Sequence, residues 1–402
     1  MRAERVAYAQ PLRPGGCTVE AVQPVSEPDR RPVEPSADAP AVERGSLVCY
    51  RMFDIAEEVD LDKLLVLLRG REARRTSMSG RHERLFQLSA APVWLDLGER
   101  DCPPLAPFGK VCARAQFFNY GVVSVSFEVP LPPRALGDFT SLSATVLESA
   151  ELTALGRTIV KELASLAEPS FQCPHEVDDF ETFTLFFIRE LRGGAGSKAL
   201  LEWEDLGKLL SGETARGKLH AWQREDLLGY AYSYLEDDLV VIDYNAALVL
   251  EPSGTREIPL LLEFANTQLL ALRYYDRALD EDLRRIYDEL EKLERKRPRR
   301  KKRYDVLAHQ VLRRSVEVRE FSDLIGNSIK LVGDFYLART YRGALRRLRI
   351  ADWQESIAKK LTLASEVYAL LKGELEHARS FFLEVLVVLL ILFEVVLVFF
   401  GH

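Results

Sequence analysis

The chain has 402 residues, of which 47% are hydrophobic and 29% charged, and its formal net charge is −7. This composition is typical of a globular, partly helical protein and excludes a chain that is disordered throughout. The five cysteines are scattered, without the close pairs of zinc sites or disulfide frameworks, which excludes a disulfide-rich secreted domain and favours a reducing compartment.

Residues 1–45 are predicted to form a disordered tail. They are rich in Pro, Ala, Gly, Arg and Glu and show no apolar periodicity, so they cannot bury enough surface to offset their chain entropy. They contain neither the apolar stretch of a secretory signal nor the acid-poor composition of a transit peptide. We therefore expect that the protein is not exported.

Residues 46–255 are predicted to fold as an α+β domain. A helical spacing of apolar residues predicts a helix at 54–69 with Asp54 as its N-cap, another at 145–167, and a short helical insertion at 200–230. β-Branched and aromatic runs bounded by Gly and Pro predict strands at 47–53, 92–98, 111–118, 120–131, 180–191 and 238–250.

Cys173 and His175 stand close together in the sequence, on either side of Pro174. Both residue types bind transition metals, but a metal site needs more ligands than two, and no second pair follows nearby. We therefore favour a packed loop over a metal site at this position.

Residues 256–380 are predicted to form a helical hairpin or coiled coil. Residues 260–297 are expected to form one helix that ends before Pro298, and a second helical region is expected from about 304 to 349. A third helix is expected to begin near Asp352 as its cap, and to carry an apolar stripe from Trp353 toward the C-terminal end. Long helices joined by short loops pack antiparallel to their neighbours.

Residues 381–400, FFLEVLVVLLILFEVVLVFF, are predicted to be a single transmembrane helix that acts as a tail anchor. Twenty residues at about 1.5 Å each cross a hydrocarbon layer of about 30 Å. A buried core helix is the alternative, but it would normally keep a polar stripe. The cationic upstream flank, with Lys372 and Arg379, predicts that the large N-terminal part lies on the cytoplasmic side of an inner membrane.

The two exceptions in this apolar stretch are the intramembrane residues Glu384 and Glu394. Ten residues separate them, which places them about 80° apart around a helix. Glu394 should cost roughly 2 to 3 kcal/mol in the bilayer unless it is protonated or paired. Either the tail self-associates through these carboxyl groups, or a protonated Glu394 is tolerated near the far interface.

A basic run, KLERKRPRRKKR at 292–303, holds nine Lys and Arg in twelve positions. In an antiparallel bundle this loop faces the bilayer, where anionic headgroups would bind it with about 1 kcal/mol per charge. RNA or a ribosome would use the same charges, although no RNA-binding signature with interleaved aromatic residues accompanies them, and a solvated loop is the third interpretation. The residues predicted to contact lipid or RNA are Arg295, Lys296, Arg297, Arg299, Arg300, Lys301, Lys302 and Arg303.

Polar residues interrupt the apolar surfaces of the first two long helices. We favour buried ion pairs that fix the helix register, although Glu263, Asp276, Lys330 and Asp334 would also suit a hydrolase or nuclease. No Glu-x-x-His pair, phosphate loop, nucleophile elbow or zinc motif occurs, so we predict no catalytic, cofactor-binding or metal residues. The predicted structural polar network is Glu263, Asn266, Arg273, Asp276, Asn327, Lys330 and Asp334.

Several of these segments resemble the family named "required for meiotic nuclear division", over roughly residues 47–400. The similar pieces are FFNYGVVSVSF, EFANTQLLALRYYD, GNSIKLVGDFYLARTYR, DWQESIAKKL and LEVLVVLLILFEV. The resemblance implies an oligomeric inner-membrane protein that supports translation by holding ribosomes near the membrane, with no established catalytic site. The missing transit peptide and an Arg-rich, Lys-poor tail would make this chain a bacterial member.

The sequence therefore predicts a tail-anchored membrane scaffold that forms homo-oligomers and tethers a cytoplasmic partner, for which the resemblance implies a ribosome or RNA. A hydrolase or nuclease with a carboxylate and lysine site in the helical bundle is one alternative. A membrane-remodelling protein that binds anionic lipid headgroups is the other.

Overall fold

The computed structural model describes residues 39–75, 91–215, 217–295, 313–323, 325 and 334–400. Within the long helices, the side chains of 289–295, 367–368, 370–383 and 392–400 lie outside this description. The predicted disordered tail lies mostly outside the described residues as well, but the first strand already begins at Val42.

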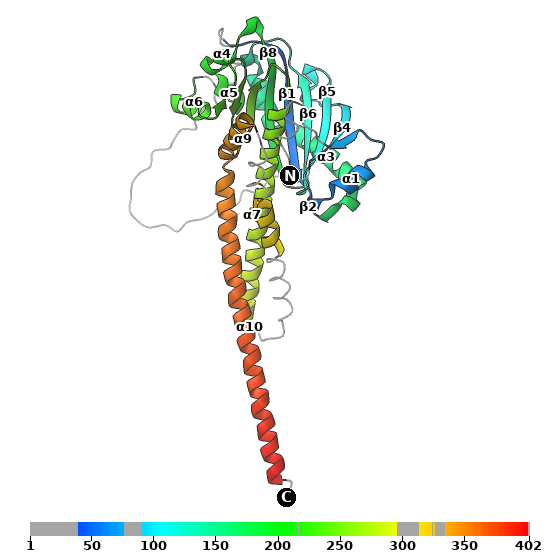
Figure 1. Ribbon diagram of the computed structural model, residues 1–402, viewed down its shortest axis with the longest axis vertical. Helices are drawn as coiled ribbons and strands as arrows, with labels where there is room; N and C mark the ends of the chain where they lie inside the picture. The colour runs from blue at the N-terminus through cyan, green and yellow to red at the C-terminus, as the bar shows by residue number, and fades with distance from the viewer. Residues whose placement is uncertain are drawn as a thin grey trace, which may run out of the picture.

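The N-terminal half is built on one nine-stranded sheet with the strand order β3-β4-β5-β6-β1-β8-β11-β10-β9 (Figure 1). Neighbouring strands are antiparallel except for β8 and β11, which run parallel. The strands are β1 (Val42–Asp54), β3 (Ala73–Arg75), β4 (Val93–Arg100), β5 (Val111–Phe117), β6 (Val122–Pro130), β8 (Phe180–Leu191), β9 (Ala231–Tyr232), β10 (Leu239–Ile242) and β11 (Ala246–Leu250). A separate ribbon pairs β2 (Ala56–Val59) with β7 (Phe171–Pro174).

Helices cover both faces of this sheet. Leu47 and Phe53 of β1 point into one core, which the shorter helices complete, whereas Val48 and Tyr50 point into a second core formed with the long helices. Because β1 is buried on both faces from Leu47 to Phe53, this part of its sequence is an apolar run interrupted only by Arg51, rather than an alternating one. The shorter helices are α1 (Leu61–Leu67), α2 (Thr140–Leu147), α3 (Ala150–Ala167), α4 (Ser197–Glu202), α5 (Leu206–Ser211) and α6 (Ala221–Leu228).

The second face is covered by the long helix α7 (Glu257–Arg295) together with α9 (Phe335–Arg347) and a helical segment at 313–323. The last helix, α10 (Ile350–Phe400), then runs beside α7 and continues past its end, away from the sheet (Figure 1). The expected mixed α/β architecture, with a sheet domain followed by long helices, is confirmed.

The helices α7 and α10 lie side by side and point in the same direction. Arg273 stacks on Trp353, Asp276 accepts a hydrogen bond from Ser356, and Asp280 pairs with Lys360, and in each pair the two residues are 80 positions apart. A constant separation of this kind arises only when two helices run parallel. The segment 313–323 runs the opposite way, because Arg314 pairs with Asp282 on α7 while Phe321 packs against Tyr275.

The helix expected at 54–69 with Asp54 as its cap is wrong. β1 continues to Asp54, β2 follows at once, and only then does α1 begin, with Asp60 accepting hydrogen bonds from the amides of Asp62 and Lys63 at 3.2 and 3.0 Å. The buried residues of β2, Ala56 and Val59, are three positions apart, a spacing that also fits a helix. Pairing with β7 decides in favour of the strand.

Two further helix boundaries differ from expectation. The helix expected at 145–167 is divided into α2 and α3, because Ser149 caps a new start by accepting a hydrogen bond from the amide of Leu152 at 3.2 Å. The last helix begins at Ile350 rather than at Asp352, whose carboxylate pairs with Arg349 at 2.6 Å.

For the stretch 381–400, the backbone is helical as part of α10. Among the residues that the structure describes, no helix reaches the length and apolar character needed to cross a membrane. Of the side chains in this stretch, those of 384–391 belong to the described part.

A substitution at Gly121 tests the contact between β2 and the turn that joins β5 to β6. Its φ is +84°, and a Cβ atom there would lie 1.6 Å from the carbonyl oxygen of Ala56. Gly121→Ala should therefore lower the free energy of unfolding by about 4 kcal/mol or more. The backbone must move away from the added Cβ atom, and alanine is also strained in the left-handed conformation. Denaturant unfolding of the full chain in detergent measures this change.

The matched control is Gly98→Ala. Gly98 has a similar φ of +70°, but no atom lies within 4 Å of its added Cβ. This control should lose only the cost of the left-handed conformation, about 1 to 2 kcal/mol. Equal losses in the two variants would show that the contact with Ala56 has no effect.

Candidate functional site

A cavity of about 560 Å³ opens where α7 begins above the sheet. The helix packs against β8, β1 and β6, but the same face of β4 and β5 lies beyond its cover. The sheet residues therefore form the floor, and the loop at 253–256 with the first two turns of α7 forms one wall. A volume of this size is in the range of small-molecule sites.

Glu263 of α7 lines this cavity and is the most deeply buried acidic group in it, with 6% of its surface exposed. Burial raises its pKa from 4.5 to about 7, while the nearby hydroxyl of Ser124 and the positive charge of Arg114 act in the opposite direction. Near neutral pH the cavity therefore contains a carboxyl group that is poised between its two protonation states.

Two positions on the same face of β5, Arg114 and Gln116, line the cavity with side chains that carry nitrogen donors. Arg114 is exposed, lines the cavity, and forms no ion pair with any described residue, since its cross-strand neighbour Asp96 instead accepts a hydrogen bond from the amide of Gly98 at 2.8 Å. Gln116 has a buried side-chain nitrogen without a hydrogen-bond partner in the described structure. A buried donor without a partner is uncommon, and it marks a place where a ligand or a water would bind.

At the rim, two other charges neutralise each other. Arg256 donates a hydrogen bond to Glu128 at 2.5 Å, and Glu128 also accepts one from Ser46 at 2.7 Å. The guanidinium of Arg256 stacks over Phe187, with 4.4 Å between its central carbon and the ring centroid. These contacts hold the loop before α7 against the sheet. Glu257 lines the cavity as well and is not without a partner, whereas Arg114 and Glu263 line it without an ion pair to any described residue.

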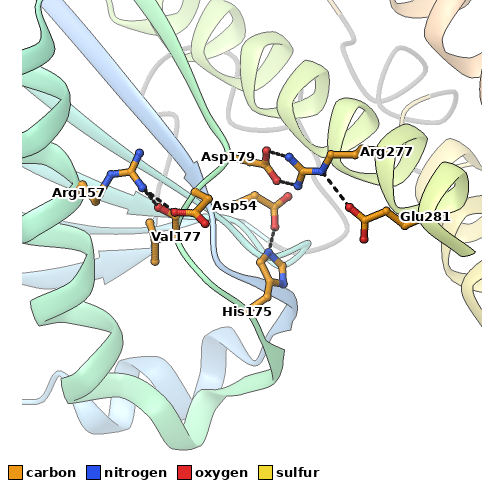
Figure 2. A network of polar contacts seen from close by, with 8 residues as sticks. Asp54, Arg157, His175, Val177, Asp179, Arg277 and Glu281 are labelled. Carbon is orange, nitrogen blue, oxygen red and sulfur yellow. Dashed lines mark hydrogen bonds and ion pairs between the residues drawn. The ribbon is translucent and has the colours of Figure 1, made fainter. Parts of the chain in front are cut away.

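A second polar cluster joins the end of β1 to the middle of α7 (Figure 2). The Nε2 atom of His175 lies 2.5 Å from Oδ1 of Asp54, whose side chain is 2% exposed and whose pKa burial raises to about 6, against the lowering effect of His175. The imidazole stacks on Tyr274 of α7 with ring centroids 4.6 Å apart. Beside it, Arg277 of α7 makes a two-pronged ion pair with Asp179.

This cluster is a seam between the sheet and the long helices rather than an open site. The residues that it connects come from β1, the loop after β7, and α7. Among the residues that the structure describes, no group of three or more His, Cys, Asp or Glu side chains is arranged to hold a metal ion. We therefore regard the cavity as the better candidate for a binding site.

The residues of the predicted polar network have separate environments. Asn266 donates a hydrogen bond to the carbonyl of Leu262 at 2.8 Å, and Arg273 pairs with Glu181 of β8 and donates to the hydroxyl of Tyr244 at 2.6 Å. Glu263 lines the cavity, Asp276 pairs with Lys360 of α10 at 2.8 Å, and Asp334 caps α9 by accepting from the amide of Leu337 at 2.9 Å. Asn327 and Lys330 lie outside the described residues.

The three described carboxylates of the suggested hydrolase site thus contact three different parts of the molecule. Glu263 faces β5 and β6, Asp276 faces α10, and Asp334 serves the start of α9. The residues predicted to contact lipid or RNA lie outside the described part, apart from Arg295, whose backbone ends α7. Glu384 is exposed, and the side chain of Glu394 lies outside the description.

The tail of α10 carries an exposed apolar surface. The seven consecutive residues Val385–Ile391 are each between 40% and 59% exposed. Successive helix residues point about 100° apart, so seven of them face every direction around the axis. A surface of this kind marks an interaction site.

Sequence reasoning missed Trp94, Arg114 and Gln116, which all line the cavity. They alternate with buried residues along β4 and β5, as the exposed positions of any half-buried strand do. The signal that distinguishes them is tertiary, because it depends on where the covering helix begins. Nothing in the local pattern of residues 92–118 carries that information.

The fold and the cavity define a mixed-sheet domain, covered by helices on both faces, with a long helical extension. Residues 44–257 match the family described as "Uncharacterized protein MJ0711, N-terminal domain", and the chain belongs to this family. The protein MJ0711 of Methanocaldococcus jannaschii is 25% identical over 178 residues, which are 43% of this chain and 52% of that protein. The chain therefore spans about half the length of the relative that it matches.

These findings correct the resemblance to the family required for meiotic nuclear division, which is wrong, since the comparisons indicate the MJ0711 family and nothing points to the other. Two of the segments that suggested it are largely buried, namely the strand residues 122–129 and the helix residues 263–276. Packing alone selects apolar residues at such positions, so a similar look does not establish kinship. The role in translation that this resemblance implied therefore loses its basis.

The buried carboxyl of Glu263 has a measurable effect on stability. Its pKa is raised in the folded state from 4.5 to about 7, so the folded chain loses stability relative to the unfolded one as the pH rises between these values. Glu263→Gln removes this loss. The difference in free energy of unfolding between the variant and wild type should favour the variant by about 3 kcal/mol more at pH 8 than at pH 4.

Denaturant titrations of the full chain in detergent at both pH values measure the difference. Glu190→Gln is the control, because Glu190 of β8 is exposed and pairs with Arg44 at the surface. That variant should show little change between the two pH values. A Glu263→Gln variant that behaves like Glu190→Gln would mean that the carboxyl is solvated in the folded state.

Proposed function

We propose that this chain is a membrane-attached scaffold whose long helices hold the sheet domain on the cytoplasmic side of the bilayer. The observation that carries the proposal is the exposed apolar surface of Val385–Ile391. It lies within the stretch 381–400, for which the sequence predicts a transmembrane helix because twenty residues at about 1.5 Å each match about 30 Å of hydrocarbon. Exposed to water, seven such side chains in a row would promote aggregation.

A lipid environment explains this surface better than a helical partner does. A partner helix covers one stripe of its neighbour, whereas the exposed residues Val385–Ile391 surround the axis completely. Lipid chains cover a helix on all sides. Self-association through Glu384 and Glu394 remains a prediction that would operate within the bilayer.

The parallel alignment of α7 and α10 supports the same arrangement. With partners 80 residues apart, Arg295 at the end of α7 is level with residue 375 of α10, about 9 Å before the apolar stretch begins. The basic run 295–303 follows directly in the sequence. We propose that anionic headgroups bind this run, with about 1 kcal/mol of attraction for each Lys or Arg.

The part of α10 from Trp353 to residue 381, called the stalk here, also sets the distance between the sheet domain and the membrane. From Trp353, which stacks on Arg273 of α7, to residue 381 is about 42 Å of helix. The paired residues between α7 and α10, including Asp276 with Lys360, orient the stalk relative to the sheet. The scaffold would thus hold its cavity at a fixed height above the membrane and present it to a cytoplasmic partner.

A pair of charges in the tail tests the attachment. Val388→Arg with Leu389→Arg places two guanidinium groups near the middle of the apolar stretch, at a cost of about 5 to 7 kcal/mol for insertion. The wild-type chain should sediment with membranes and resist extraction at alkaline pH. The double variant should move to the soluble or the extractable fraction.

The matched control is Leu363→Arg, which changes another exposed apolar residue of α10 outside the tail. This variant should remain in the membrane fraction. If the wild-type chain is soluble and the double variant only changes its molar mass in light scattering, the tail binds a second copy and the membrane proposal fails.

A further inference from the structure

We propose that the cavity at the start of α7 binds a small zwitterion, such as a free amino acid, with its carboxylate on Arg114 and Gln116 and its ammonium group on Glu263. The inference concerns the sheet domain and is independent of the membrane attachment. It rests on side chains from three elements, β4, β5 and α7, which meet only in the folded chain.

Two opposite charges, those of Arg114 and Glu263, are held apart across the cavity. Arg114 and Glu263 line the same cavity and influence each other electrostatically, yet they form no ion pair within 4 Å. The ionised form of Glu263 is unfavourable because that carboxyl is buried without a paired cation, whereas the exposed Arg114 is hydrated, and the cavity lies between these two groups. A molecule that carries both charges would satisfy both groups at once.

Strand β5 carries two hydrogen-bond donors, Arg114 and Gln116, that line the cavity. Arg114 and Gln116 are two positions apart, so their side chains project from the same face of the strand. The side-chain nitrogen of Gln116 is buried and has no partner among the described residues. A guanidinium and an amide nitrogen together suit the two oxygens of a carboxylate, and a charge-assisted hydrogen bond of this kind is about twice as strong as a neutral one.

The other ionic groups that line the cavity, which are Glu128, Arg256 and Glu257, are not free. Glu128 and Arg256 pair with each other at the rim, so they do not compete for the ligand. Apolar surface is available for the remainder of the molecule, because Trp94 is half-buried beside Gln116 and Leu260 lies on the opposite wall. The volume of about 560 Å³ leaves room for an amino acid with a large side chain.

A ligand with only one charge fits less well. A simple anion on Arg114 would lie near the carboxyl of Glu263, and a simple cation on Glu263 would lie near the guanidinium of Arg114. At pH 8, where Glu263 is mostly ionised, both arrangements place like charges beside each other, which is unfavourable. A zwitterion avoids this because its two charges are only a few bonds apart.

Thermal denaturation of the full chain in detergent at pH 8 tests the proposal. The probes are the twenty standard amino acids, each at 10 mM, and any that raises Tm is then titrated by calorimetry together with its N-acetyl derivative and its amide. At least one amino acid should bind. Its N-acetyl derivative, which lacks the ammonium charge, and its amide, which lacks the carboxylate, should each bind at least about tenfold more weakly, a loss typical of one charged hydrogen bond.

Two variants test which residue binds the carboxylate of the ligand and which binds its ammonium group. Arg114→Gln should abolish the preference for the amino acid over its amide, and Glu263→Gln should abolish the preference over its N-acetyl derivative. Arg100→Gln is the matched control, because Arg100 is an exposed arginine on β4 that does not line this cavity. It should leave all three affinities unchanged.

The affinity should also depend on pH in a defined direction. Glu263 must be ionised to bind an ammonium group, so the affinity should fall by about tenfold between pH 8 and pH 6 as this carboxyl takes up a proton. Burial raises the pKa of the neighbouring phenols of Tyr50 and Tyr120, so they stay protonated over this range. The other charged groups around Glu263 are Arg114 on β5, Glu128 on β6, and Arg256 and Glu257 at the start of α7.

Four results would overturn the proposal. They are the absence of binding by every amino acid, equal binding of the N-acetyl derivative, equal binding of the amide, and a stronger affinity at pH 6. The second would indicate a site for a simple anion and the third a site for a simple cation.

Discussion

The burial of α7 against the second face of the sheet is the contact on which the rest of the structure depends. From Ile258 to Leu272 almost every residue of this helix is buried, including the polar Asn266, Thr267 and Gln268. Those polar groups bond within the interface, for example Tyr341 donating to Gln268 at 2.7 Å and Tyr120 lying 2.8 Å from Thr267. The helix is therefore fixed in position and in rotation.

That fixed position creates both functional features. At its first turns, the helix stops short of β4 and β5, and the open space beside Glu263 is the cavity. Farther along, the same helix leaves the sheet and continues beside α10, where Asp276 and Asp280 both pair with Lys360. One continuous rod thus forms a wall of the cavity and packs against the stalk.

The sheet domain was predictable in outline because its strands follow local rules. The alternation at Val123, Val125 and Phe127 identifies β6, and the aromatic run at 180–191 identifies β8. The order of the strands was not predictable, since β1 lies between β6 and β8, far from both in sequence. The misplaced helix at Asp54 has the same cause, because the partner that makes β2 a strand, β7, lies more than 110 residues away.

The cavity was beyond local reasoning for a related physical cause. Glu263 was noticed as a polar residue in an apolar helix, and a bundle partner was expected for it, but the positive charge that acts on it belongs to Arg114 of β5. Arg114 looks like any outward-facing strand residue until the start of α7 is known. A carboxyl whose pKa burial raises to about 7, opposite an arginine with no ion pair, is stable only because the remaining buried contacts of α7 hold the helix in place. The same packing that stabilises the domain therefore keeps two opposite charges apart, and this separation is what a ligand with both charges would relieve.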